Sequence, residues 1–130
     1  MECGGYPVVM KIGRRELIAG AAATLVRSEE KTRMYGLIGK ITTKPGQRDA
    51  FAEILLQGIN AMPGCLSYVV AKDPKDENAL WVTEVWDSKA SHDASLALPE
   101  VKKAIAAGRP MIAGFGEQTI TEPIGGFGLK

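Results

Sequence analysis

Residues 65–86 read CLSYVVAK, then DPKDEN, then ALWVTEVW. The first and third segments are rich in β-branched and aromatic residues, which favour strands. The middle segment is polar and contains a proline, as expected of a loop between strands. Two such segments joined by a short loop usually pair with each other, so this stretch predicts an antiparallel hairpin with strands at residues 65–72 and 79–86.

A strand and a helix are predicted before this hairpin. Residues 35–43 alternate between two sets of side chains, which is typical of a strand with both faces partly covered. Pro45-Gly46 then predicts a turn. Residues 47–62 are expected to form a helix that ends before Pro63-Gly64. Its apolar side chains recur at spacings of three and four, which gives one apolar stripe: Phe51, Ile54, Leu55, Ile59 and Met62.

Two short helices and a strand are predicted after the hairpin. Ser88 is a candidate helix cap, and residues 88–98 and 99–107 form two helices in series because Pro99 fits a first helical turn. Residues 115–122 alternate between polar and apolar side chains and predict the last strand. The order β-α-β-β-α-β predicts an α+β, ferredoxin-like fold whose helices cover one face of a four-stranded antiparallel sheet.

The other face of the predicted sheet also carries apolar side chains. A second copy of the chain is the simplest cover, because closed two-fold association is the commonest form of homo-oligomer, and we therefore expect a homodimer. The glycine-rich residues 125–128 either cross to that partner or form a disordered end.

Composition limits the possible functions. A chain of 130 residues with 45% hydrophobic content has the length of one domain with a single core. The net charge of +1 leaves no basic surplus for phosphates, so no nucleic-acid partner is expected. Cys3 and Cys65 are too few for a disulfide framework, which fits a cytoplasmic location. The longest apolar run, residues 17–26, is too short to span a membrane.

Residues 1–33 are predicted to be an extension ahead of a domain at 34–130. Arg14-Arg15 directly precedes a short apolar run, an outline that resembles a twin-arginine export signal, so export is the alternative to the cytoplasm. No clear cleavage region follows this run. A loosely packed helix or a leader upstream of a start at Met34 are the other interpretations.

Two segments carry a family resemblance. Residues 61–68, AMPGCLSY, and residues 83–92, TEVWDSKASH, are similar to a turn with its strand and to a strand with its helix in the antibiotic biosynthesis monooxygenase family. The resemblance extends over residues 34–123. It implies a dimeric α+β barrel, and it implies oxidation of a small aromatic or quinol by O2 without flavin or metal, as in quinol monooxygenases of the family. Other members degrade haem or isomerise a small sugar.

Candidate site residues follow from strand alternation and from the resemblance. Leu80, Val82, Glu84 and Trp86 share one face of the third strand, and Trp81 lies on the other. From the next helix, His92 can lean back over the face of Glu84 and Trp86. The resemblance then implies catalytic roles for His92, Trp86 and Glu84. Candidate substrate-binding residues are Tyr68, Val82 and Trp81.

Each catalytic candidate has a specific task in that chemistry. His92 is the only histidine of the chain, and an imidazole can take a proton from a phenol near neutral pH. Trp86 offers a flat wall for a ring and an N–H for an oxygen atom, and Glu84 can orient His92 or accept a proton. Structural interpretations stay open, with His92 as a surface or capping residue and Trp86 or Tyr68 as plain packing.

No cofactor or metal is predicted. The chain has no Gly-x-Gly-x-x-Gly or phosphate-loop motif, and one histidine cannot form a histidine-based metal cluster. Some oxygenases of the family place an asparagine four residues before the strand tryptophan, where this chain has Val82, and haem-degrading members share that asparagine. Haem degradation is therefore not expected. Alternatives to the oxygenase are an acid–base isomerase of a small oxygenated metabolite and a noncatalytic ligand-binding dimer.

Overall fold

The computed structural model describes residues 33–59 and 62–129 of the chain. Four strands form one antiparallel sheet in the order β2-β3-β1-β4. The strands are β1 (Tyr35–Thr43), β2 (Cys65–Lys72), β3 (Ala79–Trp86) and β4 (Ile112–Thr121). The helices are α3 (Arg48–Gln57), α4 (Lys89–Ser95) and α5 (Pro99–Gly108), followed by the short 3-10 helix η1 (Arg109–Met111).

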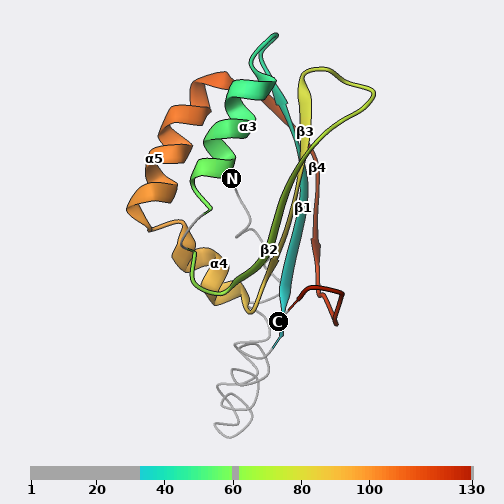
Figure 1. Ribbon diagram of the computed structural model, residues 1–130, viewed down its shortest axis with the longest axis vertical. Helices are drawn as coiled ribbons and strands as arrows, with labels where there is room; N and C mark the ends of the chain where they lie inside the picture. The colour runs from blue at the N-terminus through green and yellow to red at the C-terminus, as the bar shows by residue number, and fades with distance from the viewer. Residues whose placement is uncertain (1–32, 60–61, 130) are drawn as a thin grey trace, which may run out of the picture.

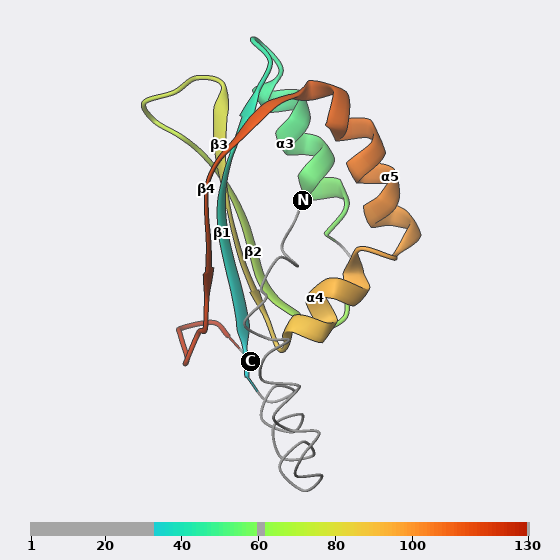
Figure 2. The ribbon, with the colours of Figure 1, turned by 180° about the vertical axis from the view of Figure 1, so that it is seen from behind.

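The molecule has two layers. All three helices lie on one side of the sheet, with α3 and α5 side by side and α4 near the end where β3 finishes (Figures 1 and 2). We call the sheet face toward the helices the inner face and the opposite one the outer face. The predicted α+β, ferredoxin-like arrangement is confirmed, including the β2-β3 hairpin and the two helices in series.

The helix ends follow local chemistry. The Ser88 hydroxyl caps α4 by accepting a hydrogen bond from the Ser91 N–H at 3.1 Å, and Pro99 lies in the first turn of α5. The predicted helix over residues 47–62 is shorter in the structure, because α3 ends at Gln57 and Gly58 is its C-cap. Glycine is a poor helix former, which accounts for the early end.

The last strand is longer than predicted at its start. It joins the sheet at Ile112, which pairs with Thr43, instead of at residue 115. The register with β1 is irregular between Gly39 and Ile41, whose partners are Gln118 and Phe115. Because three residues of β4 span two of β1, the simple alternation of side chains breaks at this point.

The core lies between the inner face and the helices. Tyr35, Leu37 and Trp86 form a buried cluster, with Ile120 packed against it. Helices α3 and α5 approach closely beside Phe51, since a methyl group added at Gly108 would lie 2.7 Å from the Phe51 ring. The same two residues, Phe51 and Gly108, also line a cavity that lies between the helices and the inner face.

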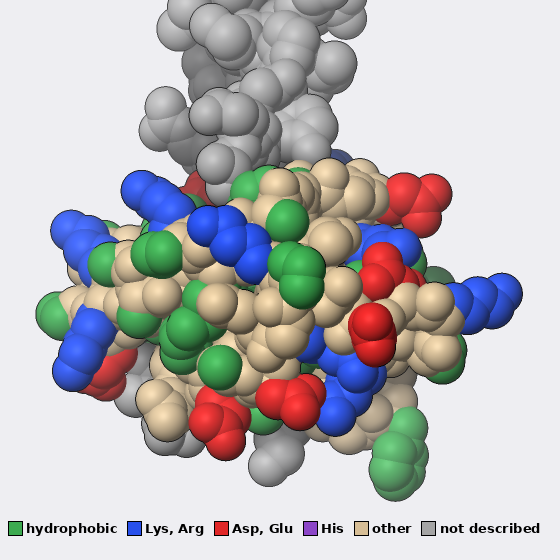
Figure 3. Space-filling view, turned by 90° about the horizontal axis from the view of Figure 1, so that it is seen from above, with side chains coloured by type: hydrophobic (Ala, Val, Ile, Leu, Met, Phe, Trp, Pro, Cys, Tyr) green, Lys and Arg blue, Asp and Glu red, His purple; other side chains and the backbone are tan. Residues whose placement is uncertain are grey.

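The surface of the described residues shows no segregation of charge on the face viewed from above. On the face seen in Figure 3, basic, acidic and hydrophobic side chains are interspersed. Within residues 33–59 and 62–129, no helix is long and apolar enough to cross a bilayer. The predicted extension over residues 1–33 lies outside the described residues, except for Arg33, which pairs with Glu122 at 3.4 Å.

Candidate functional site

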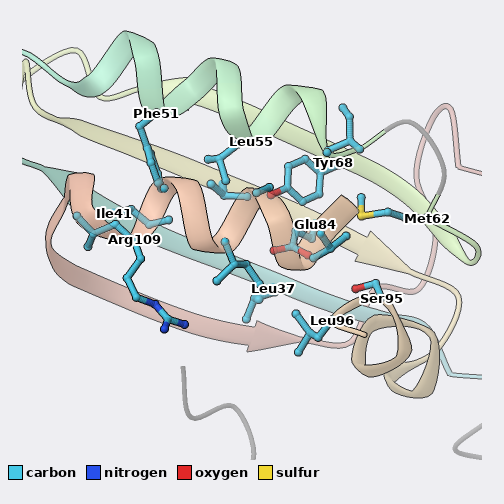
Figure 4. A pocket seen from close by; sticks show the side chains of 18 of the residues that line it. Leu37, Ile41, Phe51, Leu55, Met62, Tyr68, Glu84, Ser95, Leu96 and Arg109 are labelled. Carbon is cyan, nitrogen blue, oxygen red and sulfur yellow. The ribbon is translucent and has the colours of Figure 1, made fainter. Parts of the chain in front are cut away.

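A cavity of about 750 Å³ lies between the inner sheet face and the helices. This volume is in the range of pockets that hold small organic ligands. Apolar side chains from both layers make most of its wall, as Figure 4 shows for Leu37, Phe51 and Leu55. The residues of the wall that carry polar groups are Tyr68, Glu84, Trp86, His92, Ser95 and Arg109.

Glu84 and Trp86 are joined by a hydrogen bond on the inner face. The indole N–H of Trp86 donates to Oε1 of Glu84 at 2.9 Å. Trp86 is only 1% exposed, and burial raises the pKa of Glu84 even though this hydrogen bond and nearby His92 act in the opposite direction. The N–H of Trp86 is thus engaged by Glu84, so Trp86 presents its ring to the cavity and not its donor.

His92 lies against two aromatic rings. The centre of its ring is 5.5 Å from that of Trp86 in a T-shaped arrangement and 5.1 Å from that of Tyr35. Its exposed fraction is 5%, so the interpretation as a surface residue is wrong. The short helix α4, capped by Ser88, places it there.

One ring nitrogen of His92 has a carboxylate partner. Nδ1 lies 3.1 Å from Oδ1 of Asp93, whose other oxygen accepts from Lys89 at 2.7 Å. Partial burial raises the pKa of Asp93, but the hydrogen bonds from Lys89 and His92 outweigh it and the net pKa is lowered. A proton on Nδ1 directed at Asp93 leaves Nε2 as the basic nitrogen.

Tyr68 stands opposite Glu84 across the β2–β3 pair and lines the cavity. Burial raises the pKa of its phenol, and the charges of Glu84 and Cys65 add to the effect. The hydroxyl therefore keeps its proton at neutral pH and can donate a hydrogen bond to a ligand oxygen.

Five of the six predicted site residues line this cavity: Tyr68, Val82, Glu84, Trp86 and His92. Trp81 does not, because it points to the outer face as strand alternation requires. There its Nε1 donates to Oδ2 of Asp73 at 3.0 Å, and Nζ of Lys40 lies 5.8 Å from the centre of its ring. Trp81 thus links β3 to the loop after β2 by a hydrogen bond.

Sequence reasoning missed Ser95, Arg109 and Phe115 as cavity residues. Arg109 follows the last turn of α5, where a basic residue is common and gives no sign of a site. Phe115 belongs to the predicted last strand, but the irregular register of β4 decides which face it occupies.

The described residues do not form a cluster of metal ligands. In the part of the chain that the structure describes, no group of three or more His, Cys, Asp or Glu side chains could hold a metal ion. What the cavity does offer is an imidazole, a partly buried carboxyl group and a phenol around an apolar volume. This combination suits proton transfer to and from an apolar ligand with a polar group.

Comparisons with known proteins agree with this architecture. A family model described as antibiotic biosynthesis monooxygenase matches residues 34–107. A crystal structure from Chloroflexus aurantiacus J-10-fl that carries the same family name is 62% identical, with a TM-score of 0.73, over 75% of this chain and 99% of that one. No match was found among curated proteins.

More distant structures share the fold. A Caulobacter crescentus CB15 protein that also carries the family name is 22% identical, with a TM-score of 0.61, over 74% of this chain and 92% of its own. Rv0793 from Mycobacterium tuberculosis is 19% identical, with a TM-score of 0.61, over 72% and 98% of the two chains.

Proposed function

The chain belongs to the antibiotic biosynthesis monooxygenase family, and on this premise we propose that it oxidises a small aromatic or quinol substrate with O2, without a cofactor. The observation that carries the proposal is the cluster of Glu84, Trp86 and His92 in the wall of an apolar cavity. A flat apolar substrate can pack against this wall, and the imidazole of His92 can accept a phenolic proton.

His92 is the proton acceptor in this proposal. Its Nδ1 is occupied by Asp93, so Nε2 takes the proton from the phenol or hydroquinone. The apolar wall then keeps water from the substrate anion, whose electron-rich ring is the reductant. In this proposal the Tyr68 hydroxyl donates a hydrogen bond to a substrate oxygen. Some family oxygenases have an asparagine for this task at the position of Val82, whose side chain has no donor.

The reaction balances without an external reductant. The substrate anion gives one electron to O2, and the ring radical and superoxide combine to form a C–O bond. The O–O bond then breaks, so that one oxygen atom stays on the ring as a carbonyl and the other leaves as water. A hydroquinone and one O2 thus give one hydroxyquinone and one water.

We infer that the working unit is a homodimer. On the outer face, Val69 of β2 is 52% exposed, and Thr83 and Ile38 follow it in one row across β3 and β1. Exposed apolar side chains such as Val69 on a sheet face favour a partner sheet, and a second copy supplies one of the same shape.

O2 consumption by the purified full chain tests the oxidation. A panel of hydroquinones and polycyclic phenols is compared for the wild type, His92→Ala, His92→Gln and a matched pair of tryptophan variants. Trp86→Phe changes the cavity wall, whereas Trp81→Phe changes the outer face only. We expect saturable O2 uptake above autoxidation that both His92 variants lose, Trp86→Phe reduces and Trp81→Phe retains.

The other outcomes count against the proposal in distinct ways. Uptake that survives in both His92 variants contradicts this residue as the proton acceptor. If no substrate gives uptake above background, oxidation is wrong and an acid–base isomerase or a ligand-binding dimer takes its place. Far-ultraviolet circular dichroism shows whether each variant is folded.

A further inference from the structure

The cavity has an ionisable group at each end. Figure 4 shows Glu84 and Tyr68 at one end and Arg109 with Ile41 at the other, with Leu37 and Leu55 between them. Among the described residues, Glu84 is the only acidic residue that lines the cavity, and Arg109 is its only lysine or arginine. Such an arrangement distinguishes the two ends of a bound molecule.

The register of the sheet gives the spacing of the ends. Leu37 pairs with Glu84, and Ile41 pairs with Leu80 and Phe115, so the two ends are four residues apart along β1. At about 3.3 Å per residue, this separation is roughly 13 Å. A fused-ring molecule with one substituent is of comparable length.

Arg109 has a charge that no described acidic side chain neutralises. In the described residues, Lys40, Lys72 and Lys89 each form an ion pair with an aspartate, whereas Arg109 takes part in none. Its backbone N–H is held by the carbonyl of Ile105 at the end of α5, which fixes where the side chain starts. Its guanidinium is therefore available to a ligand at the cavity mouth.

We propose that Arg109 binds the carboxylate of an aromatic carboxylic acid, and that Glu84 orients this ligand with its uncharged ring toward Trp86 and His92. The inference deepens the proposed function by naming the substrate class of the same cavity. A guanidinium forms two parallel hydrogen bonds with a carboxylate. The ionised form of Glu84 repels a second carboxylate, so the reverse orientation is disfavoured.

The position of Arg109 favours a single negative charge over a phosphate dianion. The residue caps the C-terminal end of α5, where the partial charge of the helix is negative. That partial charge stabilises the guanidinium, and it opposes close approach of an ion with two negative charges. In the described part of the chain, no lysine and no second arginine lines the cavity to offset this effect.

Calorimetric titration with 2-naphthoate and 2-naphthylmethanol tests the proposal on the full chain. These probes have the same ring system and differ in the carboxylate. The variants are Arg109→Gln, Arg109→Lys and the control Lys103→Gln, which removes one positive charge from an exposed position of α5 outside the cavity. Neither probe has to be oxidised, so failure of the oxygenase proposal leaves this test intact.

We expect the wild type to bind 2-naphthoate about fivefold more tightly than the alcohol, as for a solvent-accessible ion pair. Arg109→Gln should abolish this preference without weakening the alcohol, Arg109→Lys should keep part of it, and Lys103→Gln should keep all of it. Equal affinities in the wild type overturn the proposal, as does failure of both probes to bind. A preference that survives in Arg109→Gln or is lost in Lys103→Gln also overturns it.

Discussion

Trp86 donates its indole N–H to the carboxyl group of Glu84, two residues earlier on the same strand. The two side chains share the inner face because alternate residues of a strand point the same way. This bond holds a partly buried carboxyl group next to an aromatic ring, and the Trp86 ring lies in a T-shaped arrangement with that of His92. The site is thus built largely from one strand and the helix that follows it.

Glu84→Gln is expected to stabilise the protein in a pH-dependent way. Burial raises the pKa of Glu84, so the folded chain binds this proton more tightly than the unfolded chain. The corresponding stability is present below the ordinary carboxyl pKa and is lost as the pH rises through the raised value. Glutamine keeps an oxygen for Trp86 and has no charge to bury.

Thermal unfolding followed by circular dichroism measures this effect. The melting temperature of Glu84→Gln should exceed that of the wild type above neutral pH, and the difference should shrink toward about pH 4. Glu77→Gln, in the exposed loop between β2 and β3, is the control and should show no such trend. A difference that does not vary with pH would contradict the burial of a charged Glu84.

Trp81→Phe is expected to lower stability without affecting ligand binding. The change removes the hydrogen bond to Asp73 and weakens the contact with Lys40, both on the outer face. Loss of one partly buried hydrogen bond costs about 1 kcal/mol of the free energy of unfolding. Urea unfolding measures that cost, and a matching titration with 2-naphthoate should give the wild-type affinity. A weakened affinity would return Trp81 to the substrate-binding residues.

Val69→Asp is expected to dissociate the proposed dimer. An unpaired charge in an interface costs on the order of 3 kcal/mol, which weakens association by about a hundredfold. Sedimentation equilibrium should give twice the chain mass of 13.9 kDa for the wild type and a mass near one chain for the variant.

Leu56→Asp is the matched control for Val69→Asp. Leu56 is 46% exposed on α3, in the helical layer, so its exposure is similar but it lies away from the outer face. A dimer that survives Val69→Asp, or that Leu56→Asp disrupts equally, places the interface elsewhere.

Strand alternation predicted much of this molecule. The three strands at residues 35–43, 65–72 and 79–86 are confirmed at their bounds, because they are rich in strand-forming residues and turn residues flank them. The same regularity placed Glu84 and Trp86 on one face. Predicting the sheet face on which Tyr68 lies required the pairing register of β2, which the local sequence does not specify.

Other features depend on contacts between distant segments. The early start of β4 arises from pairing of Ile112 with Thr43, and its irregular register follows from that pairing and not from a local pattern. The Trp86–Glu84 hydrogen bond required side-chain rotamers that alternation does not fix. Arg109 reaches the cavity only because α5 packs against α3 where Gly108 meets Phe51.

The two tryptophans of β3 lie on opposite faces of one sheet, and they are the only ones in the chain. Their fluorescence therefore reports on two separate environments. In a Trp81→Phe background, emission comes from Trp86 alone and follows occupancy of the cavity. With Trp86→Phe, emission comes from Trp81 and follows the outer face, so ligand entry and subunit association can be observed as independent optical signals.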